Sequence, residues 1–306
     1  MKKLNTSFDK GLSLQSFLKR EVADIQKAYN SASSTYLVEN MLGGIKEAKH
    51  LFGSYVPRFL EKSSASKAFS LARGAIVFSP LLPLLSIDQS MPWQEVLKQS
   101  ASALTLTSIL ASACCIGRIP NNNNKNAFAV PVIGALALEN FATGATGFGI
   151  FSTAIASYYA LMASMPDTED MEPLRKKMGT YFGVSGVGTI LTTAQSPWEI
   201  VSAISLAFNT ASTAQIASNS HRARALKTVT HILNTIYGVG YSESNSAELM
   251  GVLGLSAEAA TISENDIPKG NVNGQALTRV EQAKGYIACL KSPERRSEFS
   301  FKCNMP

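Results

Sequence analysis

Charged residues are scarce in this sequence of 306 residues. Asp, Glu, Lys and Arg make up 16% of it, against about 25% in an average soluble domain. Hydrophobic residues make up 45%, which excludes a disordered, strongly solvated chain. The net charge is +6, from 28 Lys and Arg against 22 Asp and Glu. Because the charges are confined to a few segments, their distribution is more informative than their sum.

Metal ligands and catalytic motifs are also few. The chain has four cysteines without a close CxxC pair, and its three histidines are His50, His221 and His231. We therefore predict neither a zinc site nor a disulfide framework, and no cofactor. A Ser/His/Asp set, a Walker loop and an HExxH motif are all missing, so the sequence does not indicate an enzyme.

Long stretches of the chain are almost free of charge. Residues 99–117 have none. Residues 126–166 have only Glu139, and residues 178–221 have only Glu199. Nineteen helical residues extend about 28 Å, close to the ~30 Å hydrocarbon core of a bilayer. The pattern therefore predicts membrane-spanning helices.

Turn residues divide these stretches into helical hairpins. One turn is Gly144-Ala145-Thr146-Gly147, and another is Gln195-Ser196-Pro197-Trp198. Further pairs of apolar segments surround residues 88–92 and 242–245. We expect seven to eight spans, because the sequence leaves open whether the short segment 71–88 crosses the membrane.

Basic residues occur in alternate connections. The clusters are Arg118/Lys125, Arg175/Lys176/Lys177 and Arg222/Arg224/Lys227. Two crossings separate each cluster from the next, so all three lie on one face, which the positive-inside rule places in the cytoplasm. The opposite turns have no Lys or Arg except Lys98, one turn inside its helix. We expect a multi-pass inner-membrane protein with both termini in the cytoplasm, whose partner is the lipid bilayer and not nucleic acid. The alternative is a soluble helical bundle, which the low mean hydropathy of +0.06 would fit.

The only two tryptophans lie in similar phrases. Met91-Pro92-Trp93-Gln94-Glu95-Val96 resembles Ser196-Pro197-Trp198-Glu199-Ile200-Val201. Each phrase begins a series of three predicted helices, so we interpret residues 92–165 and 197–262 as two parallel three-helix units joined by a helix at 179–194. The expected fold class is therefore an all-α polytopic membrane bundle.

The joining helix has glycines on one face. Gly179 and Gly183 are four residues apart, and Gly186 and Gly188 follow. Small residues at this spacing let helix backbones approach closely. We interpret them as a packing seam between the two units, with homodimerisation as the alternative.

Residues 92–262 resemble the PQ-loop superfamily, which includes the SWEET sugar transporters, and within it the YgjV-type inner membrane proteins. The similar segments are Pro197-Trp198-Glu199-Ile200, Ile236-Tyr237 and Gly144-Ala145-Thr146-Gly147-Phe148-Gly149. The resemblance implies transport of a small solute. The superfamily's Pro-Gln pair is absent from 100–116 and 200–217, and 148–163 and 247–262 lack the asparagine of sugar carriers. A proline-hinged mechanism and sugar selectivity are therefore not expected.

Polar residues within predicted spans are candidate solute-binding residues, because they are costly in lipid. These candidates are Glu139, Asn140, Asn209, Asn234, Tyr237 and Glu248. If the two units face each other, Glu139, Asn140 and Asn234 would approach one cavity for a small polar solute. The alternative is that they form hydrogen bonds between helices.

Two tails flank the predicted membrane region. Residues 1–70 have amphipathic helical periodicity and an excess of basic residues. We expect this cytoplasmic region to lie on the anionic inner leaflet or to pack against a partner protein, and the alternative is an ordinary amphipathic cytoplasmic domain. Residues 264–306 are expected to be a cytoplasmic tail. The leading hypothesis is a membrane protein that binds or transports a small polar solute. The alternatives are a membrane scaffold whose N-terminal helices bind a protein, and a soluble helical interaction protein.

Overall fold

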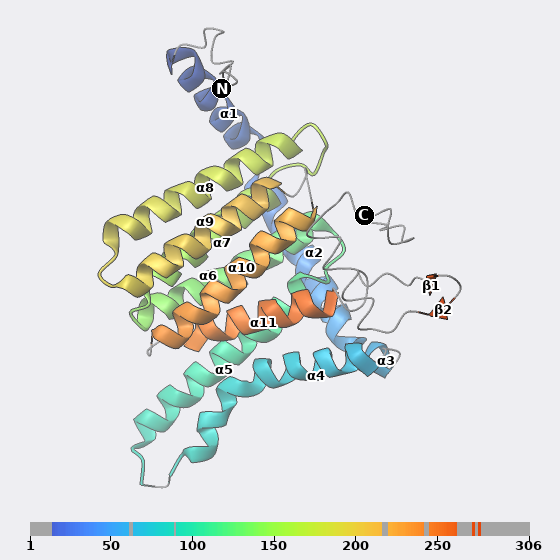
Figure 1. Ribbon diagram of the computed structural model, residues 1–306, viewed down its shortest axis with the longest axis vertical. Coiled ribbons are helices and arrows are strands. Elements are labelled where there is room, and N and C mark those ends of the chain that lie inside the picture. Colours follow the sequence, from blue (N-terminus) through green and yellow to red (C-terminus); the bar gives the residue numbers. More distant parts are fainter. Residues whose placement is uncertain are drawn as a thin grey trace.

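The computed structural model describes residues 14–60, 64–88, 90–215, 220–241, 245–261, 271–272 and 275–276. These residues form a helical protein, which confirms the all-α class (Figure 1). The helices are α1 (Leu14–Ser31), α2 (Ser34–Gly53), α3 (Tyr55–Leu60), α4 (Ser64–Phe78), the 3-10 helix η1 (Ser79–Ser86), α5 (Trp93–Ile116), α6 (Asn122–Ala142), α7 (Thr146–Ser164), α8 (Glu172–Thr193), α9 (Pro197–Gln215), α10 (Ser220–Gly240) and α11 (Asn245–Thr261). Two short strands, β1 (Asn271–Val272) and β2 (Gln275–Ala276), form an antiparallel pair.

The helix breaks fall at the turns that the sequence predicts. Gly144, between α6 and α7, has a φ of 82°, a left-handed conformation that glycine adopts without steric cost. Pro197 begins α9, and the Glu199 carboxylate accepts a hydrogen bond from the Gln195 N–H at 2.5 Å. Since a first-turn proline has no N–H to leave unpaired, this position suits it.

Helices α6 to α11 form a bundle in which each helix contacts the next along the chain, and α7 also contacts α9. Figure 1 shows the α6–α7, α8–α9 and α10–α11 connections at the same end of this bundle. The hydroxyl of Tyr241, just after α10, joins two of these connections by donating to the Gly144 carbonyl oxygen at 2.7 Å. We call this the turn end of the bundle.

The glycine face of α8 packs inside the molecule. A methyl group at Gly179 would meet Tyr158 of α7, one at Gly183 would overlap the Thr210 side chain of α9, and one at Gly186 would meet Leu206. The predicted seam is therefore real, and it holds α8 between a helix of the first predicted unit and a helix of the second. Homodimerisation stays a prediction, although three of these glycines already have partners within the chain.

Helix α1 rests on the start of α8 through ion pairs. The Lys177 ammonium lies 2.7 Å from a Glu21 carboxylate oxygen and 2.5 Å from one of Asp24. The hydrogen bond from Lys177 holds the pKa of Asp24 below its ordinary value, and the hydrogen bonds to Asp24 and Glu21 raise the pKa of Lys177. The apolar face of α1, including Val22 and Ile25, is left exposed.

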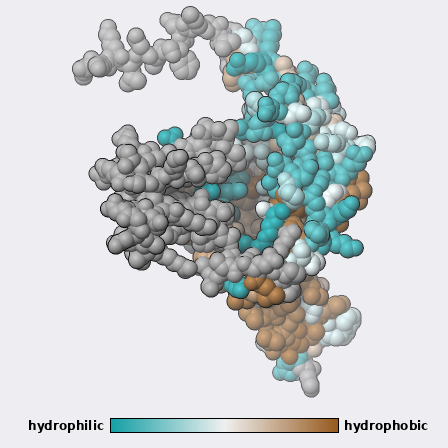
Figure 2. Space-filling model, turned by 90° about the vertical axis from the view of Figure 1, so that its right-hand side faces the viewer, coloured by the Kyte–Doolittle hydropathy of each residue, from teal (hydrophilic) through white to brown (hydrophobic). Residues whose placement is uncertain are grey.

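A helical hairpin of α4, η1 and α5 protrudes from the bundle (Figure 1). Within the described residues, two segments are long and apolar enough to cross a membrane, Lys67–Ser86 and Trp93–Ile116. Only 11% of the first apolar window and 28% of the second are buried. Figure 2 shows the resulting hydrophobic surface at one end of the molecule. The sequence left open whether residues 71–88 cross the membrane, and most of this segment lies within the apolar segment Lys67–Ser86. The larger number of spans stays a prediction.

The predicted repeat also stays a prediction. Its two opening helices, α5 and α9, have different surroundings. α9 packs against α7, α8 and α10, whereas α5 contacts mainly η1 and α6, and its first half protrudes. The two predicted units are therefore not packed alike.

Replacing Gly183 with Ala should destabilise the bundle by about 1–3 kcal/mol, because the added methyl group overlaps Thr210. Gly188→Ala is the matched control, since a methyl group at Gly188 meets nothing within 4 Å. Removing a glycine from the helix interior there should be neutral or stabilising by up to ~1 kcal/mol. Chemical unfolding of the purified variants in detergent measures both effects. Equal stability of the two variants would contradict the seam.

Candidate functional site

Polar side chains join the helices at and near the turn end of the bundle. Asn140, in the last turn of α6, is fully buried. Its Oδ1 accepts a hydrogen bond from the Ser246 hydroxyl of α11 at 2.7 Å, and its Nδ2 donates to the Leu136 carbonyl oxygen at 2.7 Å. A residue predicted to contact solute is thus bonded to a helix that begins 105 positions later in the chain, at Asn245.

A second polar contact joins α9 and α10. The buried Ser205 hydroxyl is hydrogen-bonded to Asn234 Oδ1 and also lies 3.3 Å from the Thr230 carbonyl oxygen. The Thr230 hydroxyl in turn lies 3.4 Å from the Ser205 carbonyl oxygen. These groups satisfy one another across the helix pair, which is how buried polar groups avoid the cost of desolvation.

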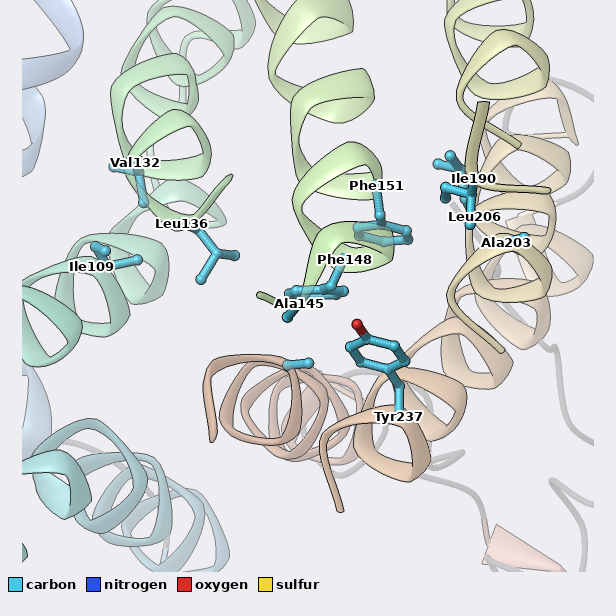
Figure 3. Close-up of a cluster of buried hydrophobic side chains, with 11 residues drawn as sticks. Ile109, Val132, Leu136, Ala145, Phe148, Phe151, Ile190, Ala203, Leu206 and Tyr237 are labelled. Carbon is cyan, nitrogen blue, oxygen red and sulfur yellow. The ribbon is translucent and has the colours of Figure 1, made fainter. Parts of the chain in front are cut away.

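Tyr237 lies at the centre of the hydrophobic cluster between these contacts (Figure 3). Its ring stacks on Phe148 of α7, with centroids 5.9 Å apart, and on Tyr241, at 5.6 Å. The side chain is fully buried, and its hydroxyl points toward the start of α7, near the backbone of Phe148. Tyr237 therefore anchors α10 to α7.

The other predicted residues are less central. Glu139 is half-buried, and its carboxylate lies near the Ser246 hydroxyl. The backbone of Glu248, in the first turn of α11, packs against Gly238 of α10. Asn209 lies elsewhere, beside Thr210 at a cavity of about 20 Å³, which is enough for about one water molecule. The structure thus brings Glu139, Asn140, Tyr237 and Glu248 to the turn end, sets Asn234 one turn deeper, and separates Asn209.

Several buried hydroxyls of the described residues are left over in this bundle, among them those of Tyr181 on α8 and Tyr237 on α10. Within the described residues, the hydroxyls of Ser152 on α7 and Ser202 on α9 have no hydrogen-bond partner, although their side chains are at most 1% exposed. Ser202 lies three positions before Ser205, so both belong to one face of α9. Such hydroxyls provide polar capacity at the core that the protein itself does not use.

The chemistry that this arrangement supports is mainly neutral hydrogen bonding. Its groups are amides and hydroxyls joined between helices, the buried phenol of Tyr237, and the carboxylates of Glu139 and Glu199 near the connections. Among the described residues, no three His, Cys, Asp or Glu side chains are placed to hold a metal ion.

A buried arginine that the sequence pattern does not reveal lies at the opposite end of the bundle. Arg175 was assigned to a basic connection, but it lies inside α8, with only 5% of its side chain exposed. It pairs with Asp167 and donates to Asn123 Oδ1 at 2.6 Å and to the Met162 carbonyl oxygen at 2.8 Å. Asn123 also donates to the Tyr36 hydroxyl at 3.1 Å, which ties α2 to the same point. The nearby Asp167 was the available signal, but an acidic neighbour eight positions away in sequence does not reveal burial.

Comparisons of this chain with models of protein families, with curated proteins and with solved structures give no match. The resemblance to the PQ-loop superfamily therefore rests on the short segments quoted above and stays a prediction.

The Asn234–Ser205 contact should be measurable as a coupling free energy. In a double-mutant cycle of Asn234→Ala and Ser205→Ala, we expect a coupling of about 0.5–1.5 kcal/mol, the range for polar contacts between membrane helices. The control cycle combines Ser205→Ala with Asn140→Ala, which share no partner in the described contacts and should be additive within ~0.5 kcal/mol. Unfolding in detergent provides the free energies. Additivity in the first cycle would show that this pair does not stabilise the fold.

Proposed function

We propose that this chain is an integral membrane protein that acts as a helical scaffold, with the α4–η1–α5 hairpin embedded in lipid. The observation on which this rests is the exposure of the hairpin. Phe78, Leu82, Leu97 and Leu104 are each 57–62% exposed. A soluble protein rarely leaves an apolar surface of this extent in contact with water, whereas lipid contacts it without cost.

The length of the hairpin agrees with this placement. The 24 residues of α5 extend about 36 Å at 1.5 Å per residue, more than the ~30 Å hydrocarbon core. Asp88, Glu95 and Lys98 lie near the tip, and Arg73 and Arg118 lie at the base. This distribution of charge favours a cytoplasmic base under the positive-inside rule.

The exposed side of α8 also suits lipid. Its residues between Val184 and Thr193 are uncharged. The exposed hydroxyls of Thr189 and Thr192 donate to carbonyl oxygens four residues earlier in the same helix, at 2.9 and 3.0 Å. Because these hydroxyls are satisfied within the helix, they need no water. This supports the finer proposal that the bundle, as well as the hairpin, crosses the membrane in several spans.

A scaffold is favoured over a solute carrier because of the polar groups themselves. Asn140 and Asn234, two central residues of the predicted solute site, are buried and hydrogen-bonded to neighbouring helices. Meanwhile α1 exposes an apolar face with Val22 and Ile25 near half exposed. We infer that α1 receives a cytoplasmic protein partner, as amphipathic helices commonly do.

The second candidate is the carrier of a small polar solute suggested by the sequence. The observation that favours it is that the buried hydroxyls of Ser152, Ser202 and the predicted site residue Tyr237 lack hydrogen-bond partners among the described residues. A solute passing through the bundle would find its hydrogen bonds there, and access would require the helices to separate.

Embedding of the hairpin is tested by placing a charge at its middle. Leu104→Lys should impair membrane insertion by about 3 kcal/mol, the cost of a lysine near the centre of a spanning helix. Val38→Lys on α2 is the matched control, since Val38 is 56% exposed and Leu104 57%. Carbonate extraction of membranes measures the inserted fraction. Equal extraction of the two variants would contradict the proposal.

Labelling in a cysteine-free background then tests the orientation. Cysteines at Ser90 and at Asn122 should react with an impermeant reagent from opposite faces of the membrane. Reaction from one face would exclude a spanning hairpin. A cysteine at Ser196 extends the test to the bundle, where reaction from the same side as Ser90 would support several spans.

Scaffold and carrier differ in the accessibility of the bundle core. Ser202→Cys in intact membranes should stay unreactive toward a small water-soluble thiol reagent if the protein is a scaffold, because the Ser202 side chain is fully buried. A carrier exposes its core in each cycle and would be labelled within minutes. Ser185→Cys, on the exposed face of α8, is the positive control. Once detergent replaces the lipid, this cysteine should react with the same reagent.

A further inference from the structure

A cleft lies at the base of the hairpin, where α4 and the end of α5 meet α2 and α3. Its volume is about 370 Å³, within the range of ~300–1,000 Å³ typical of small-molecule sites. Leu51 and Phe52 of α2 form one wall, and Val77 and Phe78 of α4 form another. Arg73 and Arg118 provide its charged groups. We call this space, in which these six residues are the main groups, the base cleft.

The base cleft is a cationic site with apolar walls. Two arginines line it, and no Asp or Glu is among the lining residues that the structure describes. Arg73 is held in place because it donates to the carbonyl oxygens of Ser256 and Ala257, at 3.4 and 3.2 Å. Both guanidinium groups lie near Cys114, another lining residue, so they belong to the same part of the cleft. An anion with an apolar part matches this combination of charge and wall.

The order of residues along the hairpin sets the direction of such a ligand. From base to tip, α4 presents Arg73, then Val77 and Phe78. The antiparallel arm of the hairpin has Arg118 just beyond the end of α5, at the base, and Ala111, also in the lining, nearer the tip. Charge therefore lies at the base and apolar surface toward the tip on both sides. A phospholipid has the same order, from its phosphate at the interface to acyl chains in the membrane.

We propose that the base cleft binds one anionic phospholipid of the cytoplasmic leaflet, with its phosphate between Arg73 and Arg118 and an acyl chain along the Val77 and Phe78 wall. The proposal rests on the membrane placement of the hairpin given above. Arginine suits this role because its planar guanidinium pairs with two phosphate oxygens at once. Basic pockets beside membrane helices on this side bind anionic headgroups in the same way.

The test is native mass spectrometry of the full chain in detergent, titrated with phosphatidylglycerol, phosphatidylcholine or inorganic phosphate. The wild-type chain should bind phosphatidylglycerol at least ten-fold more tightly than phosphatidylcholine. The Arg73→Gln/Arg118→Gln double variant should lose that preference and at least ten-fold in affinity. Lys49→Gln, which removes an exposed charge on α2 outside the cleft, should bind like the wild type.

A second variant keeps both arginines and fills the apolar part. Ala111→Phe should also weaken phosphatidylglycerol binding at least ten-fold, so the test does not depend on the stability of the arginine variant. Unchanged affinity in either variant, or equal affinity for the two lipids, overturns the proposal. Inorganic phosphate that competes as well as the lipid would mean that a free anion is the ligand and would also overturn it.

The outcome for the cleft is separable from that for the membrane. If the wild-type chain is recovered from cytosol without detergent, the membrane proposal fails, and a short-chain phosphatidylglycerol can still be titrated against the soluble protein. If the chain is inserted in membranes and the lipid preference is missing, only the cleft proposal fails.

Discussion

The bundle depends on hydrogen bonds between polar side chains of neighbouring, nearly charge-free helices. A helix satisfies its own backbone, but not an asparagine or serine that faces another helix. Asn140 has its partner in Ser246, and Asn234 in Ser205. Each contact fixes the rotation of two helices relative to each other, because a one-residue rotation would bury both polar groups without partners. The stacked rings of Phe148 and Tyr237 then fill the space between these contacts.

Charged side chains are concentrated at one end of the bundle. Ion pairs gather at the end opposite the turns, where Arg175 joins α8 to the connection before it and Lys177 joins α8 to α1. On the exposed side of α8, threonine hydroxyls bond to their own helix instead. The molecule therefore has a charged end attached to the N-terminal helices and an uncharged body, a division that suits a protein held between water and lipid.

In our proposal, the protruding hairpin is the part of the molecule that is embedded in lipid. Its apolar side chains have few partners within the described chain, so they need a non-aqueous neighbour. At its base, Arg73 binds the carbonyl end of α11 and also faces the base cleft. The residue that fastens the hairpin to the bundle is thus one of those proposed to hold a lipid, which would couple the hairpin's position to the composition of the membrane.

The local part of this structure could be predicted from the sequence. Helix ends at Gly144 and Pro197 follow from backbone preferences that act over a few residues. The glycine seam of α8 was predicted from spacing alone, since close approach needs only small side chains on one face. Among the candidate site residues, the sequence identified Asn140 and Asn234 as polar groups that need explanation, but it could not identify their partners.

Tertiary structure decided the rest, because those partners are far apart in the chain. Ser246 follows Asn140 by 106 positions, and no local pattern determines which of many serines will face it. Burial of Arg175 likewise required α2, α7 and α8 to converge on one point. The exposure of the hairpin, too, depends on which helices fail to cover it. Short-range forces therefore determined the helices, whereas packing between distant segments determined which polar groups are satisfied inside and which surface is left for lipid.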